Sequence, residues 1–220
     1  MKRKFQHIAY LLMVAAVLTS CGEKKQTSEF PDWAWADFQR PEGINPIVSP
    51  DTTTVFYCPM RQDSVAWESS DTFNPAATIY DGKVVVLYRA EDNSAVGIGS
   101  RTSRLGYAYS DDGLHFNRMT VPVFYPADDN QKELEWPGGC EDPRVAVTDD
   151  GLYVMLYTQW NRKQARLAVA TSRDLQIWEK YGPAFAKAYG GRFFDEFSKS
   201  ASIVTKLVDG KQVIAKIDGK

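Results

Sequence analysis

Two blocks of this chain repeat each other, and this repeat limits the possible fold more than any other feature of the sequence. Each block has a polar residue before a proline, an Asp-Gly pair, an apolar β-branched run, a segment of alternating small and aromatic residues, and a Ser-x-Asp turn. The blocks cover residues 73–116 and 141–178, with an offset of 68 or 69 in the first two segments and 62 in the third. Loops of unequal length explain the change in offset.

The repeat predicts three or four short strands per unit, with no amphipathic helix between units. Four-stranded units with this period are typical of a β-propeller, whereas a single β-sandwich would not need the recurrence. A third unit begins near Ser198–Val204 and reaches Asp218-Gly219-Lys220, which resembles Asp81-Gly82-Lys83. The strand after that turn is missing. We therefore expect an all-β, partial propeller of about two and a half blades, from a longer protein.

The N-terminus has the pattern of a bacterial lipoprotein signal. Lys2, Arg3 and Lys4 precede a short apolar run, Ile8–Leu18, which is too short to span a bilayer comfortably. Leu-Thr-Ser-Cys follows and predicts lipidation of Cys21. We expect a signal peptide at 1–21, a polar tether at 22–44 and an incomplete propeller domain at 45–220, anchored to a membrane of the bacterial cell envelope, on its periplasmic or surface face.

Composition and charge exclude several classes of function. The net charge of −2 and the pI of about 5.8 give no basic face for nucleic acid. Cys58 and Cys140 are the other cysteines, and they can pair in an oxidising compartment, although two cysteines alone do not establish a disulfide. His115 is the only histidine after the signal, so neither a His-based triad nor a metal site is expected.

The Glu141-Asp142-Pro143-Arg144 segment is the best candidate for chemistry. Asn74 and Asp142 are equivalent in the repeat, and equivalent positions of successive blades converge on the central channel of a propeller. Alternation along a strand predicts Asp142 and Arg144 on one face and Glu141 on the other. Two readings stay open: Asp142 is a catalytic acid, or it caps a turn and pairs with Arg144.

Five segments in the same order and spacing resemble glycoside hydrolase family 130, the family of β-mannoside phosphorylases and β-1,2-mannosidases. The resemblance covers about residues 45–220 and implies a five-bladed β-propeller that acts on a mannose-containing oligosaccharide. The five segments are Phe73-Asn74-Pro75-Ala76, Leu87-Tyr88-Arg89-Ala90, Ser103-Arg104-Leu105-Gly106, Ser110-Asp111-Asp112-Gly113 and Gly139-Cys140-Glu141-Asp142-Pro143-Arg144.

The resemblance assigns a role to several of these residues. Asp142 matches the general acid of the family, which protonates the glycosidic oxygen directly or through a sugar hydroxyl. Asn74 and Arg89 match residues that hold the mannose whose bond is cleaved. Further substrate contacts are expected from residues in the same segments: Ser103, Arg104 and Arg144.

Three functions stay open from the sequence. An inverting β-mannosidase uses water activated by a carboxylate, for which Glu196, or its neighbour Asp195, is a candidate. A β-mannoside phosphorylase uses inorganic phosphate as co-substrate, and Lys199 is then a candidate phosphate ligand. A non-catalytic glycan-binding lipoprotein or an inactive fragment is the third. The export signal favours the hydrolase, because phosphorolysis that conserves bond energy suits the cytoplasm. No other cofactor is expected.

Overall fold

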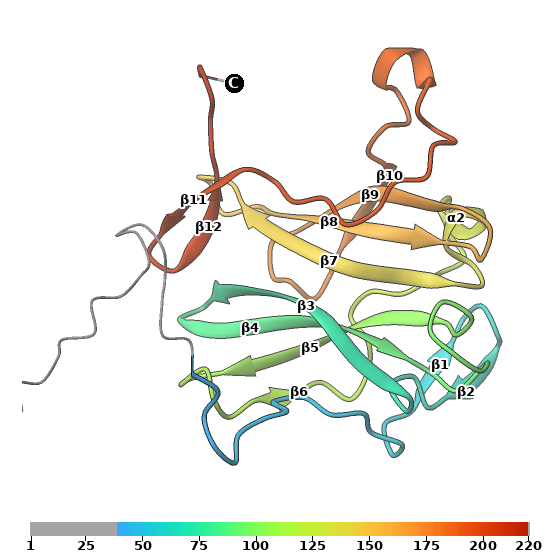
Figure 1. Cartoon of the computed structure of the whole chain (residues 1–220), viewed down its shortest axis with the longest axis vertical. Helices are drawn as coiled ribbons and strands as arrows, with labels where there is room; N and C mark the ends of the chain where they lie inside the picture. Colours follow the sequence, from blue (N-terminus) through green and yellow to red (C-terminus); the bar gives the residue numbers. More distant parts are fainter. Residues whose placement is uncertain (1–38, 220) are drawn as a thin grey trace, which may run out of the picture. The chain divides into compact units, whose positions relative to one another are not determined.

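Strands make up almost all of the regular structure in residues 39–219, the part of the chain that the computed structural model describes (Figure 1). The predicted signal, Cys21 and most of the tether lie outside the described residues. The helical elements are α2 (Lys132–Glu135) and the 3-10 turn η1 (Ala188–Gly191). The strands are β1 (Phe56–Cys58), β2 (Asp63–Val65), β3 (Asp71–Tyr80), β4 (Lys83–Glu91), β5 (Ser103–Ser110), β6 (Asn117–Arg118), β7 (Gly139–Val147), β8 (Tyr153–Trp160), β9 (Ala165–Ser172), β10 (Glu179–Pro183), β11 (Thr205–Val208) and β12 (Lys211–Ile214).

The predicted repeat is confirmed strand by strand. Strands β3, β4, β5 and β6 pair in that order as an antiparallel first unit, and β7, β8, β9 and β10 form the second unit in the same way. Figure 1 shows the two sheets lying over each other, with one parallel bridge between Ser103 of β5 and Gly139 of β7. The chain is thus nearly all-β, as the sequence predicts.

The hairpin turns explain one change of offset in the repeat. The turn between β3 and β4 has two residues, Asp81 and Gly82, both with positive φ. Four residues separate the paired Ile79 and Val84 across this turn, whereas five separate the equivalent pair Val147 and Tyr153 between β7 and β8. The second unit therefore gains one residue, which changes the offset from 68 to 69.

The third unit differs from the sequence-based expectation. Strands β11 and β12 form a complete hairpin around Asp209 and Gly210, whose φ angles of 48° and 76° nearly match the 49° and 73° of the first hairpin turn. Asp218 and Gly219 have similar φ angles, 51° and 75°, so the angles do not choose between the two pairs. Asp209-Gly210 joins two paired strands, as Asp81-Gly82 does, and is therefore the counterpart of that turn. The strand that seemed to be missing is β12, which bridges β7 in parallel.

The Ser-x-Asp turns recur with the same hydrogen bonds. Asp112 Oδ1 accepts the N–H groups of the two residues after Gly113, and Asp174 Oδ1 accepts the equivalent pair after Leu175. The residue after the Asp of each turn, Gly113 or Leu175, has positive φ. Glycine adopts this conformation without strain, whereas the buried Leu175 must be held in it by its packing. These turns end the third strand of each unit at the same point.

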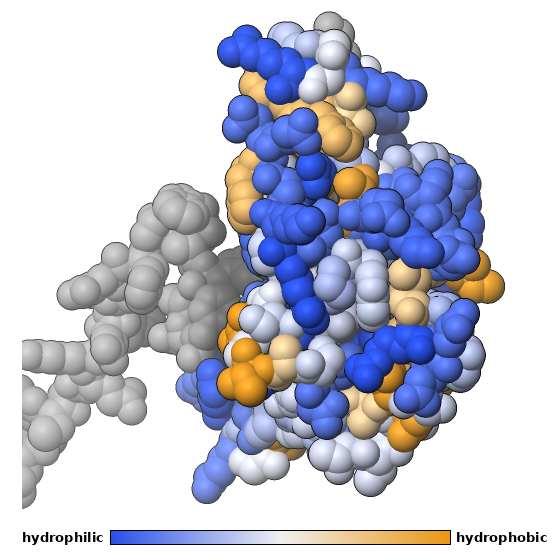
Figure 2. Space-filling model, turned by 90° about the vertical axis from the view of Figure 1, so that its right-hand side faces the viewer, coloured by the Kyte–Doolittle hydropathy of each residue, from blue (hydrophilic) through white to orange (hydrophobic). Residues whose placement is uncertain are grey.

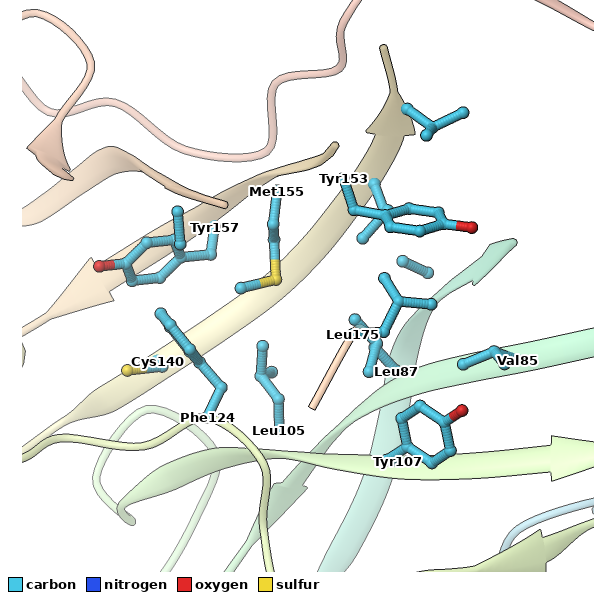
Figure 3. Packing of buried hydrophobic residues seen from close by; sticks show 14 of the residues in the cluster. Val85, Leu87, Leu105, Tyr107, Phe124, Cys140, Tyr153, Met155, Tyr157 and Leu175 are labelled. Atoms are coloured by element: carbon cyan, nitrogen blue, oxygen red, sulfur yellow. The ribbon is translucent and has the colours of Figure 1, made fainter. Parts of the chain in front are cut away.

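The main core lies between the two sheets (Figure 3). Apolar side chains on the inner faces of β3, β4 and β5 meet those of β7, β8 and β9, and burial of this apolar area is the main force that holds the sheets together. The residues that carry most of this packing are Val85, Leu87, Leu105, Tyr107, Phe124, Val145, Tyr153, Met155, Tyr157 and Leu175.

A second core fixes the N-terminal segment on the outer face of the first unit. Trp67, fully buried, stacks on Tyr88 of β4, and Phe56 and Val65 of the β1–β2 hairpin pack beside them. Cys58 belongs to this second core, whereas Cys140 belongs to the main core. Both are free and buried, so these cysteines do not pair.

The face of the protein in Figure 2 is mostly hydrophilic, with hydrophobic residues in small separate groups. Scattered apolar residues of this kind are normal on a protein surface. None of the helices among residues 39–219 is long and apolar enough to cross a membrane. The scattered apolar residues of this face do not indicate a binding site.

Candidate active site

Matching β-bulges in the first strand of each unit place Asn74 and Asp142. In β3 the register shifts between Phe73 and Ala76, and in β7 it shifts between Glu141 and Arg144, so each strand gains one residue. Asn74 and Asp142 have left-handed φ angles of 44° and 51°, a conformation that Asn and Asp tolerate better than most residues.

The proline after each of these residues fits the bulge, because an unpaired bulge position needs no N–H donor. Residues before proline normally avoid helical φ and ψ, so the left-handed angles of Asn74 and Asp142 are strained. Strain of this kind is tolerated where the surrounding structure holds the backbone in place. The left-handed conformation directs both side chains toward one point, where Asn74 Nδ2 donates a hydrogen bond to Asp142 Oδ1 at 2.9 Å.

Arg89 is the centre of the site. Its Nη1 lies 3.1 Å from Asp142 Oδ1, and its Nη2 lies 2.5 Å from Glu91 Oε1 and 2.8 Å from Glu141 Oε1. Its Nε donates to Ser103 Oγ at 3.0 Å. The guanidinium also lies 4.5 Å from the ring centroid of Phe73. Every edge of this buried cation therefore has a partner, which fixes its orientation.

Lys199 closes the site from the segment before β11. Its Nζ lies 2.7 Å from Glu141 Oε2 and 3.1 Å from Asp142 Oδ2. The side chain of Lys199 is 40% exposed, whereas those of Glu141 and Asp142 are only 2% and 3% exposed. Lys199 is thus the cation of the site that a solute can reach. We call Asn74, Arg89, Glu91, Ser103, Glu141, Asp142 and Lys199 the Asp142 cluster.

The cluster lies at one common end of the strands. A single row of paired residues crosses both units at this end, from Asp71 and Glu91 through Ser103 and Gly139 to Trp160 and Ala165. A Cβ at Gly139, which has φ +115°, would lie 2.2 Å from the carbonyl oxygen of Ser103. Only glycine therefore lets the two units approach closely enough to bring Ser103 beside Glu141.

Burial and charge act in opposite directions on Asp142. Burial raises the pKa of this carboxyl, but the Asn74 hydrogen bond and the positive charges of Arg89 and Lys199 outweigh burial and hold its pKa below the ordinary value. For Lys199, burial lowers the pKa, and the hydrogen bond and charges of Glu141 and Asp142 raise it above its ordinary value. In the ligand-free cluster Asp142 is therefore a carboxylate at neutral pH.

Replacing Lys199 by methionine is expected to raise the pKa of Asp142, because the change removes a cation that favours the carboxylate. In the full-length protein, the carbon-13 chemical shift of the Asp142 carboxyl should titrate at higher pH in Lys199→Met than in the parent. Lys206→Met, which removes an exposed lysine of β11, is the matched control. An unchanged titration in Lys199→Met would show that the charge of Lys199 does not affect the pKa of Asp142.

Several predicted site residues are brought together by the fold. Asn74, Arg89, Ser103, Asp142 and Lys199 all belong to the Asp142 cluster. Their roles as acid and as ligands stay predictions.

Arg104 and Arg144 are not brought to this cluster. Arg104 is fully buried on the opposite face of β5, where it pairs with Asp92 at 2.8 Å and lies near Cys58, so a substrate cannot reach it. Arg144 bonds the carbonyl oxygen of Pro143 instead of pairing with Asp142. Of the two readings left open from the sequence, the one in which Arg144 pairs with Asp142 does not match the structure.

The predicted split between Glu141 and Asp142 was also wrong. Both carboxylates contact Arg89 and Lys199, because the bulge at Asp142 interrupts the alternation that would place them on opposite faces. Glu91 is a further cluster residue that the sequence analysis missed. It stands two residues after Arg89 on the same strand, and that spacing places both side chains on one face.

The segment after η1 carries the other predicted residues. Asp195 pairs with Arg166 at 2.9 Å, whereas Glu196 is exposed and makes no ion pair with residues 39–219. No group of three or more His, Cys, Asp or Glu within that range has the arrangement of a metal site.

The repeated four-stranded units define a propeller-like fold, and a buried acid lies with an Asn and an Arg at their common end. The model of glycoside hydrolase family 130, described as beta-1,4-mannooligosaccharide phosphorylase, matches residues 39–220. The chain belongs to this family, whose members are mannoside phosphorylases and glycosidases.

The relatives of this chain include a phosphorylase and a structure described with glycoside hydrolases. A 1,2-beta-oligomannan phosphorylase of Thermoanaerobacter sp. (strain X514) is 36% identical over 152 residues, which are 67% of this chain and 46% of the relative. A crystal structure from Bacteroides thetaiotaomicron VPI-5482 is 99% identical, with a TM-score of 0.85 over 87% of this chain and 55% of that one. The chain thus spans about half the length of these relatives.

Another solved structure is described with glycoside hydrolases of the family that target beta-1,2 mannosidic linkages in Candida mannan. It is 69% identical to this chain, with a TM-score of 0.84 over 86% of this chain and 53% of that one.

Proposed function

We propose that the full-length protein is an inverting β-mannosidase that cleaves β-1,2-linked mannosides, with Asp142 as general acid. The remaining length of its relatives would complete a five-bladed propeller. Asn74 and Arg89 orient the mannose whose bond is cleaved, and Asp142 protonates the departing oxygen. The lipobox before Cys21 supports a lipid-anchored enzyme of the cell envelope.

The charge balance around Asp142 carries this proposal. Arg89 and Lys199 supply two positive charges, whereas Glu91, Glu141 and Asp142 supply three negative charges, so the ionised cluster has a net charge of 2 − 3 = −1. Each cation already contacts at least two carboxylates. Adding a phosphate dianion would place like charges together in a poorly solvated site, whereas water adds no charge.

The negative cluster also suits an acid. A bound mannoside that displaces Lys199 would remove one of the cations that hold the pKa of Asp142 below its ordinary value, and would raise that pKa toward the range a general acid needs. Glu196 is the candidate base, because it is the carboxylate without an ion pair, among residues 39–219, on the segment that carries Lys199. The solved structure at 69% identity, whose description names glycoside hydrolases that target beta-1,2 mannosidic linkages, supports a hydrolase.

Phosphorolysis is the second candidate function. The curated relative at 36% identity is a phosphorylase, and Lys199 is exposed enough to meet phosphate.

The products of β-1,2-mannobiose cleavage distinguish the two functions. We expect the full-length protein to release two mannose molecules at the same rate in phosphate-free buffer and in buffer with phosphate. Direct detection of the first-formed anomer by NMR should show inversion. Cleavage that requires phosphate and yields mannose 1-phosphate would contradict the hydrolase and establish the phosphorylase.

A further inference from the structure

We propose that Phe197 forms the aromatic floor of the subsite for the leaving-group sugar, with Trp160 as its support. This inference rests on the proposed function, because it assigns the part of the substrate that departs from Asp142. A neutral hexose is the class of ligand that such a floor would take.

The segment around Ser198 sets the direction of its neighbours. The backbone N–H of Ser198 donates to the carbonyl oxygen of Ala165 at 3.1 Å, and Ser198 Oγ accepts from the N–H of Leu167 at 3.0 Å. These bonds tie Ser198 to the start of β9. The flanking residues turn away from β9, since Phe197 contacts Trp160 of β8 and Lys199 contacts Glu141 of β7.

The distance along the chain suits a sugar that neighbours the acid. Two residues of extended chain span about 7 Å, so Phe197 stands roughly one pyranose unit before Lys199. Lys199 itself reaches Asp142 at 3.1 Å. A disaccharide with its glycosidic oxygen at Asp142 would therefore extend its second ring toward Phe197.

Trp160 is held from two sides. Its Nε1 donates to the carbonyl oxygen of Gly99 in the β4–β5 loop at 2.8 Å. Its ring rests on Gly138, where a Cβ would lie 2.3 Å from Trp160 Cδ1. Phe197 packs on this fixed ring with the centroids 6.2 Å apart and the planes inclined by 61°. Trp160 is thus a support, and the free aromatic surface belongs to Phe197, which is 65% exposed.

The chemistry at this point favours a sugar over other ligands. An aromatic face carries negative quadrupole charge, which attracts the weakly positive C–H groups on the apolar face of a hexose. Hydroxyl groups at the edge of the same sugar would find donors and acceptors in Lys199 and Asp142. A single exposed phenyl group needs no explanation by itself. This one stands two residues before Lys199, which contacts the buried Asp142, and it packs on a tryptophan held from two sides. Together these observations point to a ligand.

Binding to an inactive full-length Asp142→Asn background tests the inference. Calorimetry with β-1,2-mannobiose is expected to show affinity about tenfold lower in Phe197→Ala than in the background, and Phe197→Trp should restore it. Mannose, which fills only the subsite on the other side of the acid, should bind both proteins equally. Tyr189→Ala is the matched control, because Tyr189 is an aromatic of the same segment and is 86% exposed.

Two results would overturn the inference: equal mannobiose affinity in Phe197→Ala and its background, or an equal loss in Tyr189→Ala. Neither result concerns the proposed function, which is tested by the cleavage of mannobiose in the unmodified protein. A protein that binds mannobiose through Phe197 without cleaving it would contradict the mannosidase and retain the subsite.

Discussion

Asp142→Asn in the full-length protein is expected to lower kcat for β-1,2-mannobiose by about 10²- to 10⁴-fold, the range for loss of a general acid. An amide cannot donate the proton that the departing oxygen needs. The fold should persist, because the Asn side-chain oxygen can still accept from Asn74 and Arg89. Lys199 loses its contact with Oδ2 but keeps Glu141, and the net charge of the cluster rises from −1 to zero. Steady-state kinetics and a thermal melt measure the two effects.

Asp150→Asn is the matched control for this change. Asp150 lies in the exposed turn between β7 and β8 and pairs with Arg173, so its replacement should leave kcat unchanged. An Asp142→Asn protein that turns over mannobiose at nearly the normal rate would remove Asp142 from the mechanism. It would leave the cluster as a structural network.

Arg89→Met is expected to destabilise the protein by about 3–5 kcal/mol, the cost of leaving a buried ion-pair partner uncompensated. Glu91, Glu141 and Asp142 would lose their shared cation, and their side chains are at most 3% exposed. Lys199 can neutralise part of the charge on Glu141 and Asp142, whereas Glu91 would keep only Arg101, whose Nη1 lies 3.6 Å from Glu91 Oε2. Urea unfolding of the full-length protein measures the change in free energy.

Arg173→Met serves as the control for loss of an arginine. Arg173 pairs with Asp150 at the surface, where both side chains are more than half exposed, so its contribution should be below about 1 kcal/mol. Equal stability of the Arg89→Met and Arg173→Met proteins would mean that the three buried carboxylates take up protons instead. A shift of the unfolding midpoint to lower values at high pH, in Arg89→Met alone, would reveal that uptake.

The repeat was the most informative part of the sequence, because it predicted a contact as well as a fold. Asn74 and Asp142 are 68 positions apart and hydrogen-bonded at 2.9 Å. Their equivalence places them on the first strand of neighbouring units, where equivalent side chains converge. Arg89 and Ser103 could be added because they occupy strand ends of the same unit.

The errors have physical causes that strand periodicity does not encode. A bulge at Asp142 shifts the alternation, which turns Glu141 toward Arg89 and separates Arg144 from the acid. Arg104 pairs with Asp92 on the far face of β5, where its chemistry resembles that of a site residue but its environment is core. The face of the sheet on which a charged residue at a strand end lies cannot be predicted until the positions of the β-bulges are known.

The bulges at Asn74 and Asp142 also bear on how a duplicated unit acquires different tasks. Both keep the same left-handed backbone and the same following proline, yet one side chain is an amide that donates and the other an acid that can lose and regain a proton. In the proposed mechanism, this exchange of an NH₂ group for an oxygen separates the residue that holds the substrate from the residue that donates the proton. Two copies of one backbone bulge could then serve recognition and chemistry separately, with no change in backbone geometry.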